Sequence, residues 1–153
     1  MEAVRAFRGW MRVSVALYAL GGLAFAVSPS TAHGDVDALF RLLPGLSAWD
    51  PMPATLAHSW TALSVSMMAT ISACCWFAAK NPLKNKDFAV PVMVSKAVSS
   101  VGGILLLLVH ARYAIYLVLF TTDFPLFLLT LFLWRRLPAT VAAAPEPVPG
   151  AAP

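Results

Sequence analysis

The chain has 153 residues, of which 59% are hydrophobic and only 12% are charged, and its formal net charge is +4. Soluble domains carry about a quarter charged residues, so half that share together with long apolar runs excludes an ordinary soluble protein. The positive charge does not indicate binding to nucleic acid, because the basic residues flank apolar segments in the manner of membrane-topology signals. The length allows one compact bundle and no separate soluble domain.

Four apolar segments are each long enough to cross a bilayer as a helix, which takes about 20 residues. They cover residues 10–27, 53–79, 88–109 and 113–134. We therefore predict an all-α fold, an up-and-down bundle of four transmembrane helices within residues 1–137. The Ala- and Pro-rich remainder, residues 138–153, holds nothing that can form a core and is predicted to be a disordered tail.

The first apolar segment also fits a signal peptide. Basic residues precede it, and Ala24-Phe25-Ala26 resembles a cleavage site. The apolar region is at the long end for a signal peptide, however, and Gly22 with Ala26 forms a pair of small residues at the spacing that lets helices approach closely. We expect the segment to remain as the first span, and N-terminal sequencing distinguishes the two interpretations.

The polar connection at residues 28–52 contains one short amphipathic segment, residues 35–43. Its apolar side chains recur with the spacing of one helical face, and acidic residues in its first turn favour the helix dipole. We expect a short helix at the outer membrane surface, and we favour a tethered connector over a gate. The apolar face consists of Val36, Leu39, Phe40 and Leu43.

Eight of the eleven basic residues fall on one side of the predicted bundle. Because loops rich in Lys and Arg remain in the cytoplasm, this bias predicts that both termini are cytoplasmic. The eight residues are Arg5, Arg8, Arg12, Lys80, Lys84, Lys86, Arg135 and Arg136.

The third span carries the clearest helix-packing pattern. Ser95, Ser99 and Gly103 repeat every four residues, which places small side chains along one helical face. Such faces bring helices together within one chain or between chains. We therefore expect this protein to contact the lipid bilayer and, in addition, to bind a partner, either another membrane protein or a second copy of this chain.

Two ionisable residues stand where hydrocarbon is expected, Lys96 in the third span and Asp123 in the fourth. A charge at membrane depth is costly, so it pairs, faces a wet cavity or extends to the interface. Three interpretations follow: Lys96 extends to the surface, the two residues form a structural pair, or the pair marks a ligand or proton site. Ser100, one turn after Lys96, and Thr122, beside Asp123, are candidates to line the same site.

A metal or haem site is a further hypothesis. His58 and His110 fall at the outer ends of their predicted helices, where two imidazoles at one level can bind a metal. The pattern lacks a second histidine or a carboxylate on the same turn, and no catalytic or cofactor motif accompanies it. The adjacent Cys74 and Cys75 point in different directions on a helix, so we expect free thiols that serve as small packing residues.

Parts of the second and third spans resemble small bacterial four-helix inner-membrane proteins of the DoxX-like kind. The residues that carry the resemblance are Trp76-Phe77-Ala78-Ala79-Lys80-Asn81-Pro82 and Val94-Ser95-Lys96-Ala97-Val98-Ser99-Ser100. The resemblance covers about a third of the chain and implies an up-and-down four-helix bundle in the inner membrane. It implies no particular set of site residues.

Three functions are consistent with these features. The abundant packing signals and the lack of a catalytic set favour a non-enzymatic accessory or assembly subunit of a membrane complex. The alternative is a small carrier or hydrophobic-ligand binder with Lys96 and Asp123 in its site. The third is a membrane redox protein that uses His58 and His110.

Overall fold

The computed structural model contains four long helices and no strand within the residues that it describes. All four are long and apolar enough to cross a membrane, so the predicted all-α, four-span membrane fold is confirmed. The predicted amphipathic segment at residues 35–43 lies, apart from Ala38 and Leu42, outside the described part of the chain. The described residues are 1–27, 38, 42, 54–110 and 112–138, with the backbone alone for 54–60.

The helices follow one another with short connections in the second half of the chain. A single 3-10 turn, η1, precedes the third long helix. The elements are α1 (Glu2–Val27), α3 (Ala54–Lys80), η1 (Lys86–Phe88), α4 (Ala89–Val109) and α5 (Ala114–Arg135).

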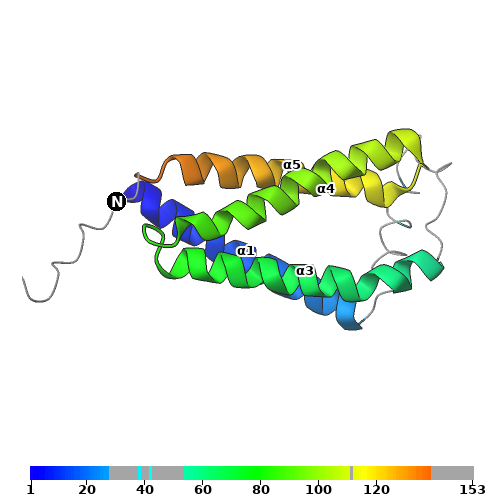
Figure 1. Cartoon of the computed structure of the whole chain (residues 1–153), viewed down its shortest axis with the longest axis horizontal. Coiled ribbons are helices and arrows are strands. Elements are labelled where there is room, and N and C mark those ends of the chain that lie inside the picture. The colour runs from blue at the N-terminus through cyan, green and yellow to red at the C-terminus, as the bar shows by residue number, and fades with distance from the viewer. Residues whose placement is uncertain (28–37, 39–41, 43–53, 111, 139–153) are drawn as a thin grey trace, which may run out of the picture.

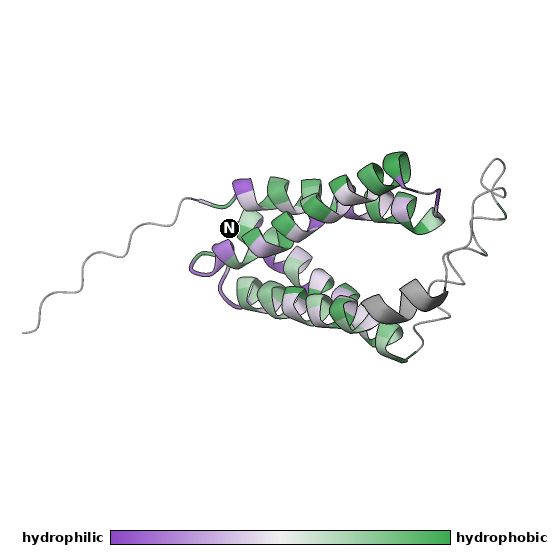
Figure 2. Ribbon diagram, turned by 45° about the vertical axis from the view of Figure 1, so that its right-hand side comes forward, coloured by the Kyte–Doolittle hydropathy of each residue, from purple (hydrophilic) through white to green (hydrophobic). Residues whose placement is uncertain are grey.

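The four helices form two pairs, α1 with α3 and α4 with α5, and contacts within each pair exceed those between the pairs. Figure 1 shows the pairs side by side at the end that holds the N-terminus, the turn from α3 to α4 and the end of α5. Figure 2 shows that the ribbons of the two pairs diverge toward the opposite end. We call the end that holds the N-terminus the basic end, because it carries the eight basic residues named above.

The apolar core lies toward the basic end, and α1 starts earlier than the span predicted at residues 10–27. Phe7 and Met11 are fully buried although arginines surround them in the sequence. They begin a stripe that continues through Ser14 and Tyr18 at helical spacing, and the stripe faces the other helices. The core consists of Phe7, Met11, Tyr18, Ile71, Cys75, Ala78, Ala79, Ala89, Val92 and Leu137.

Polar and aromatic contacts close the basic end. Asn85 Nδ2 donates to the carbonyl of Phe77, 3.0 Å away, and so satisfies one of the last carbonyls of α3. The ring of Phe77 packs on that of Phe88, with centroids 5.3 Å apart. Lys86 Nζ lies 5.7 Å from the centre of the Trp134 ring, which ties the turn to α5.

Gly103 permits the closest approach between α4 and α5. A Cβ atom at this position would lie 2.7 Å from the Tyr116 carbonyl oxygen and 3.2 Å from Leu119 Cβ. The nearer atom belongs to the backbone, so it has little freedom to move aside. The two helices can therefore hold this separation only with glycine here.

Replacement of Gly103 by alanine is expected to destabilise the protein by about 1–3 kcal/mol, the usual cost of inserting a methyl group into a packed contact. The matched control is Gly102→Ala, because no atom lies within 4 Å of a Cβ at Gly102. Thermal unfolding in detergent micelles measures both variants. Equal stability of the two would show that α4 and α5 do not meet at Gly103.

Candidate functional site

The candidate site is an ion pair between α4 and α5 at membrane depth. Lys96 Nζ lies 2.7 Å from Asp123 Oδ1, and the two side chains are 11% and 10% exposed. Each charge compensates the other in surroundings of low dielectric, where either alone would be costly. The pair therefore joins the two helices and leaves the site with no net charge.

Two serines on α4 complete the surroundings of the pair. Ser99 Oγ donates to Asp123 Oδ2, so each oxygen of the carboxylate accepts a hydrogen bond. Ser100 Oγ donates to the Lys96 carbonyl at 2.7 Å and is 2% exposed. Ser99 follows Lys96 by three residues, which places both side chains on one helical face. Ser100 thus bonds its own helix and does not touch the carboxylate.

Tyr18 brings α1 to the same site. Lys96 Nζ lies 4.6 Å from the centre of the Tyr18 ring, within the range of a cation–π contact. Tyr18 is 9% exposed, and its hydroxyl has no hydrogen-bond partner among the described residues. The ammonium of Lys96 therefore contacts side chains from both helix pairs.

The contact between the helix pairs ends at the level of this site. Beyond Tyr18, the only described residue of α1 that is buried is Gly22, and it packs on Met68 of its own partner α3. On the other side of Asp123, toward the opposite end, Ala114 is the only buried residue of α5. The ion pair thus lies where the shared core stops and the helix pairs separate.

A second link between the pairs lies closer to the basic end. Trp10 Nε1 donates to Thr130 Oγ1 at 2.9 Å, and Thr130 Oγ1 donates in turn to the Leu126 carbonyl at 2.7 Å. Thr130 is 2% exposed, so this hydrogen bond is shielded and fixes α1 against α5. It holds the helices that carry Tyr18 and Asp123 in register.

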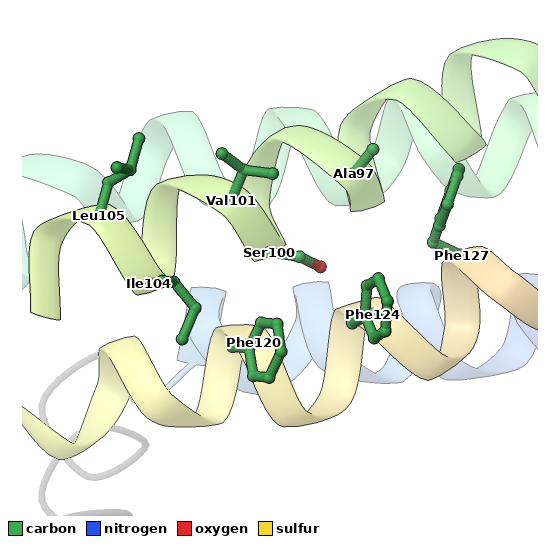
Figure 3. Close-up of a pocket in the computed structure, with 8 residues that line it drawn as sticks. All are labelled: Ala97, Ser100, Val101, Ile104, Leu105, Phe120, Phe124 and Phe127. Carbon is green, nitrogen blue, oxygen red and sulfur yellow. The ribbon is translucent and has the colours of Figure 1, made fainter.

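An apolar pocket of about 290 Å³ lies between α4 and α5. Figure 3 shows the rings of Phe120 and Phe124 beneath α4, with the Ser100 side chain between the two helices. The lining of the pocket contains one polar side chain, Ser100, whose hydroxyl already donates a hydrogen bond to the Lys96 carbonyl. The residues that line it are Ala97, Ser100, Val101, Ile104, Leu105, Phe120, Phe124 and Phe127.

Other residues singled out from the sequence lie apart from the ion pair. Thr122 is exposed and donates to the Val118 carbonyl at 2.7 Å within α5. Ala26 is exposed, whereas Gly22 packs against Met68. Ser95 is half-buried.

Of the two histidines in the predicted metal site, the structure describes the side chain of His110 alone. The side chain of His58 lies outside the described residues. His110 is exposed at the end of α4, where its ring lies 6.1 Å from that of Tyr113 and 6.4 Å from that of Tyr116. Within the described part of the chain, no three His, Cys, Asp or Glu residues are grouped as metal ligands. Cys74 is half-buried and Cys75 is buried, and both are free thiols.

Sequence reasoning did not assign Tyr18 or Ser99 to this site. Tyr18 stands on the buried stripe of α1, four residues after Ser14, which is the signal that could have identified it as inward-facing. Ser99 was assigned to helix packing alone. Its position three residues after Lys96 could have indicated that it shares the face of the charged side chain.

The chain matches no protein-family model, no curated protein and no solved structure. Any statement about its function therefore rests on the residues and the geometry above.

Loss of one partner of the ion pair is expected to be worse than loss of both. Lys96→Met or Asp123→Asn leaves an uncompensated charge in the membrane and should destabilise the protein by about 3–5 kcal/mol. The double variant removes both charges and should be more stable than either single variant. Unfolding in detergent micelles gives the three values.

Exposed charges of the same types serve as controls. Lys84→Met and Asp87→Asn alter residues at the basic end that are exposed, and each should change stability by less than about 0.5 kcal/mol. If the cost of the double variant equals the sum of the single costs, the pair contributes no interaction.

Proposed function

We propose that this protein binds a hydrophobic small molecule within the membrane, as a carrier or a binding protein, at the site formed by Lys96 and Asp123. The observation that carries the proposal is the position of the ion pair: it lies at membrane depth, where the two helix pairs stop sharing a core. Ionisable groups inside spans most often serve substrates, ions or protons, because their burial is costly. The residual exposure of both side chains leaves them within reach of a ligand.

The surroundings of the ion pair support this proposal over a purely structural brace. A brace needs contacts within α4 and α5 only, and the Lys96–Asp123–Ser99 hydrogen bonds already provide them. Lys96 also contacts Tyr18 on α1, across the boundary between the pairs. A ligand entering between the pairs would meet this ammonium and this ring first.

The direct test is to identify what the protein carries. Native mass spectrometry of the wild-type protein, gently extracted from its own membrane, should show one defined small molecule per chain. The Lys96→Met/Asp123→Asn variant should keep the fold, because it leaves no charge uncompensated, and the amount bound should fall at least tenfold. Wild-type protein that arrives without any small molecule, from membranes that contain its normal lipids, would contradict the proposal.

An accessory or assembly subunit is the second candidate function. Gly102 favours it, because this half-buried glycine on α4 has no atom within 4 Å of its Cβ position. It therefore offers a second helix a site of close approach, in the way small residues do in membrane interfaces. A partner of this kind would be another membrane protein or a second copy of the chain.

Gly102→Leu is the variant that tests this second function. The larger side chain should dissociate a complex formed through α4 and leave the isolated protein folded, since the position has room for it. The mass of the extracted assembly reports the loss of the partner. The control is Val90→Leu, an exposed residue about 120° around α4 from Gly102. An unchanged assembly with Gly102→Leu would place the partner, if one is bound, on another face.

We further propose that both termini lie in the cytoplasm and that the membrane is a bacterial inner membrane. The positive-inside rule supports the orientation, since the basic residues gather at the end that holds the N-terminus and the end of α5 (Figure 1). The likeness to DoxX-like proteins rests on the sequence pattern of the second and third spans alone and supports the choice of membrane.

A further inference from the structure

We propose that the ligand of this site is a neutral molecule with a hydrocarbon body and a carbonyl oxygen, which accepts hydrogen bonds from Tyr18 Oη and Lys96 Nζ. This inference rests on the proposed function and names the chemical class of the ligand. It follows from two properties of the site, the hydrogen-bond donors that remain unused and the net charge.

Two groups at the site have hydrogen bonds left to make, a hydroxyl that can donate or accept and an ammonium that can only donate. The Tyr18 hydroxyl has no hydrogen-bond partner among the described residues, although the residue is 9% exposed. Lys96 Nζ carries three N–H groups, donates one to Asp123 and faces the ring of Tyr18. A polar group left unpaired at membrane depth is costly, so a ligand that supplies an acceptor oxygen gains where a hydrocarbon gains nothing.

Each acceptor beside Lys96 already has one hydrogen bond, although a carboxylate oxygen can accept another. Asp123 accepts from Lys96 through Oδ1 and from Ser99 through Oδ2. The Lys96 carbonyl accepts from Ser100. The ammonium of Lys96, by contrast, can only donate, and two of its three N–H groups have no acceptor among the described residues. A ligand that brought only donors, such as an amine, would leave these groups unpaired, so the arrangement favours an acceptor on the ligand.

The net charge of the site selects a neutral acceptor over an anionic one. Lys96 and Asp123 compensate each other, so a carboxylate or phosphate brought next to them would leave one uncompensated negative charge in the membrane interior. Lys96 is the only described basic residue inside α4 or α5 away from the helix ends, and Arg12, the nearest on α1, stands six residues before Tyr18 with an exposed side chain. A ketone, quinone or ester carbonyl satisfies the donors without adding charge.

The position of the site fits a ligand with an apolar body. Beyond Tyr18 toward the opposite end, Phe25 follows seven residues later on the same face of α1 and is half-buried. On α4, Leu107 follows Lys96 three turns later on the same face and is also half-buried. The carbonyl would thus be held beside the ion pair while the hydrocarbon extends along apolar side chains.

The experiment compares three probes with chains of the same length: 2-hexadecanone, hexadecanoate and hexadecane. Each is titrated in radiolabelled form into the full-length protein in detergent micelles, and the ketone is also prepared with a ¹³C carbonyl. We expect the ketone to bind at least tenfold more tightly than either other probe. Its bound carbonyl stretch should move to lower wavenumber than in empty micelles, because hydrogen bonds weaken the C=O bond.

Tyr18→Phe is the decisive variant, since it keeps the ring beneath Lys96 and removes only the hydroxyl. Its affinity for the ketone should fall about three- to tenfold, the range that corresponds to one neutral hydrogen bond. Its affinity for hexadecane should not change, and part of the infrared shift should be lost. The matched control is Tyr116→Phe, which alters a tyrosine in contact with His110 and Tyr113 instead.

The outcomes separate this inference from the proposed function. Saturable binding of hexadecanoate or hexadecane as tight as that of the ketone, or an unshifted carbonyl stretch, overturns the carbonyl inference and leaves a hydrophobic-ligand binder. A ketone affinity unchanged in Tyr18→Phe also overturns it. Absence of saturable binding for all three probes overturns the inference together with the proposed function.

Discussion

Burial of one ammonium and one carboxylate inside a membrane is the constraint on which the rest of this structure depends. Neither charge is tolerable alone at that depth, so α4 and α5 must remain in contact wherever Lys96 and Asp123 lie. Gly103 provides the close approach that this contact requires. Ser99 then donates a hydrogen bond to the second oxygen of the Asp123 carboxylate. Helix separation, glycine position and serine position are thus consequences of a single electrostatic requirement.

The sequence was sufficient for the spans and for the two charged residues, and insufficient for the geometry that joins them. Hydropathy identifies the four spans because apolar runs of about 20 residues are typical of transmembrane helices. Lys96 and Asp123 are conspicuous because ionisable residues are rare at that depth. Tyr18 is less conspicuous, since a tyrosine within a span also suits an interfacial belt, and the spacing after Ser14 indicates an inward-facing stripe without showing what that stripe meets.

The early part of α1 shows why local composition can conceal packing. Arg5, Arg8 and Arg12 suggest a membrane-surface collar, yet Phe7 and Met11 between them are fully buried in the core. The arginines occupy other faces of the same helix, so one segment carries a basic surface and also contributes Phe7 and Met11 to the core. Composition averages over these faces, whereas burial depends on which of them meets α3 and α5.

The assignment of both charges to one helical hairpin has a consequence for how the chain enters the membrane. Because α4 and α5 are consecutive and joined by only a few residues, Lys96 can meet Asp123 before either has any contact with α1 or α3. The hairpin can therefore be inserted as an electrically neutral unit, with the cost of burying each charge offset within it. The contact with Tyr18 then belongs to a later step, in which two inserted hairpins dock.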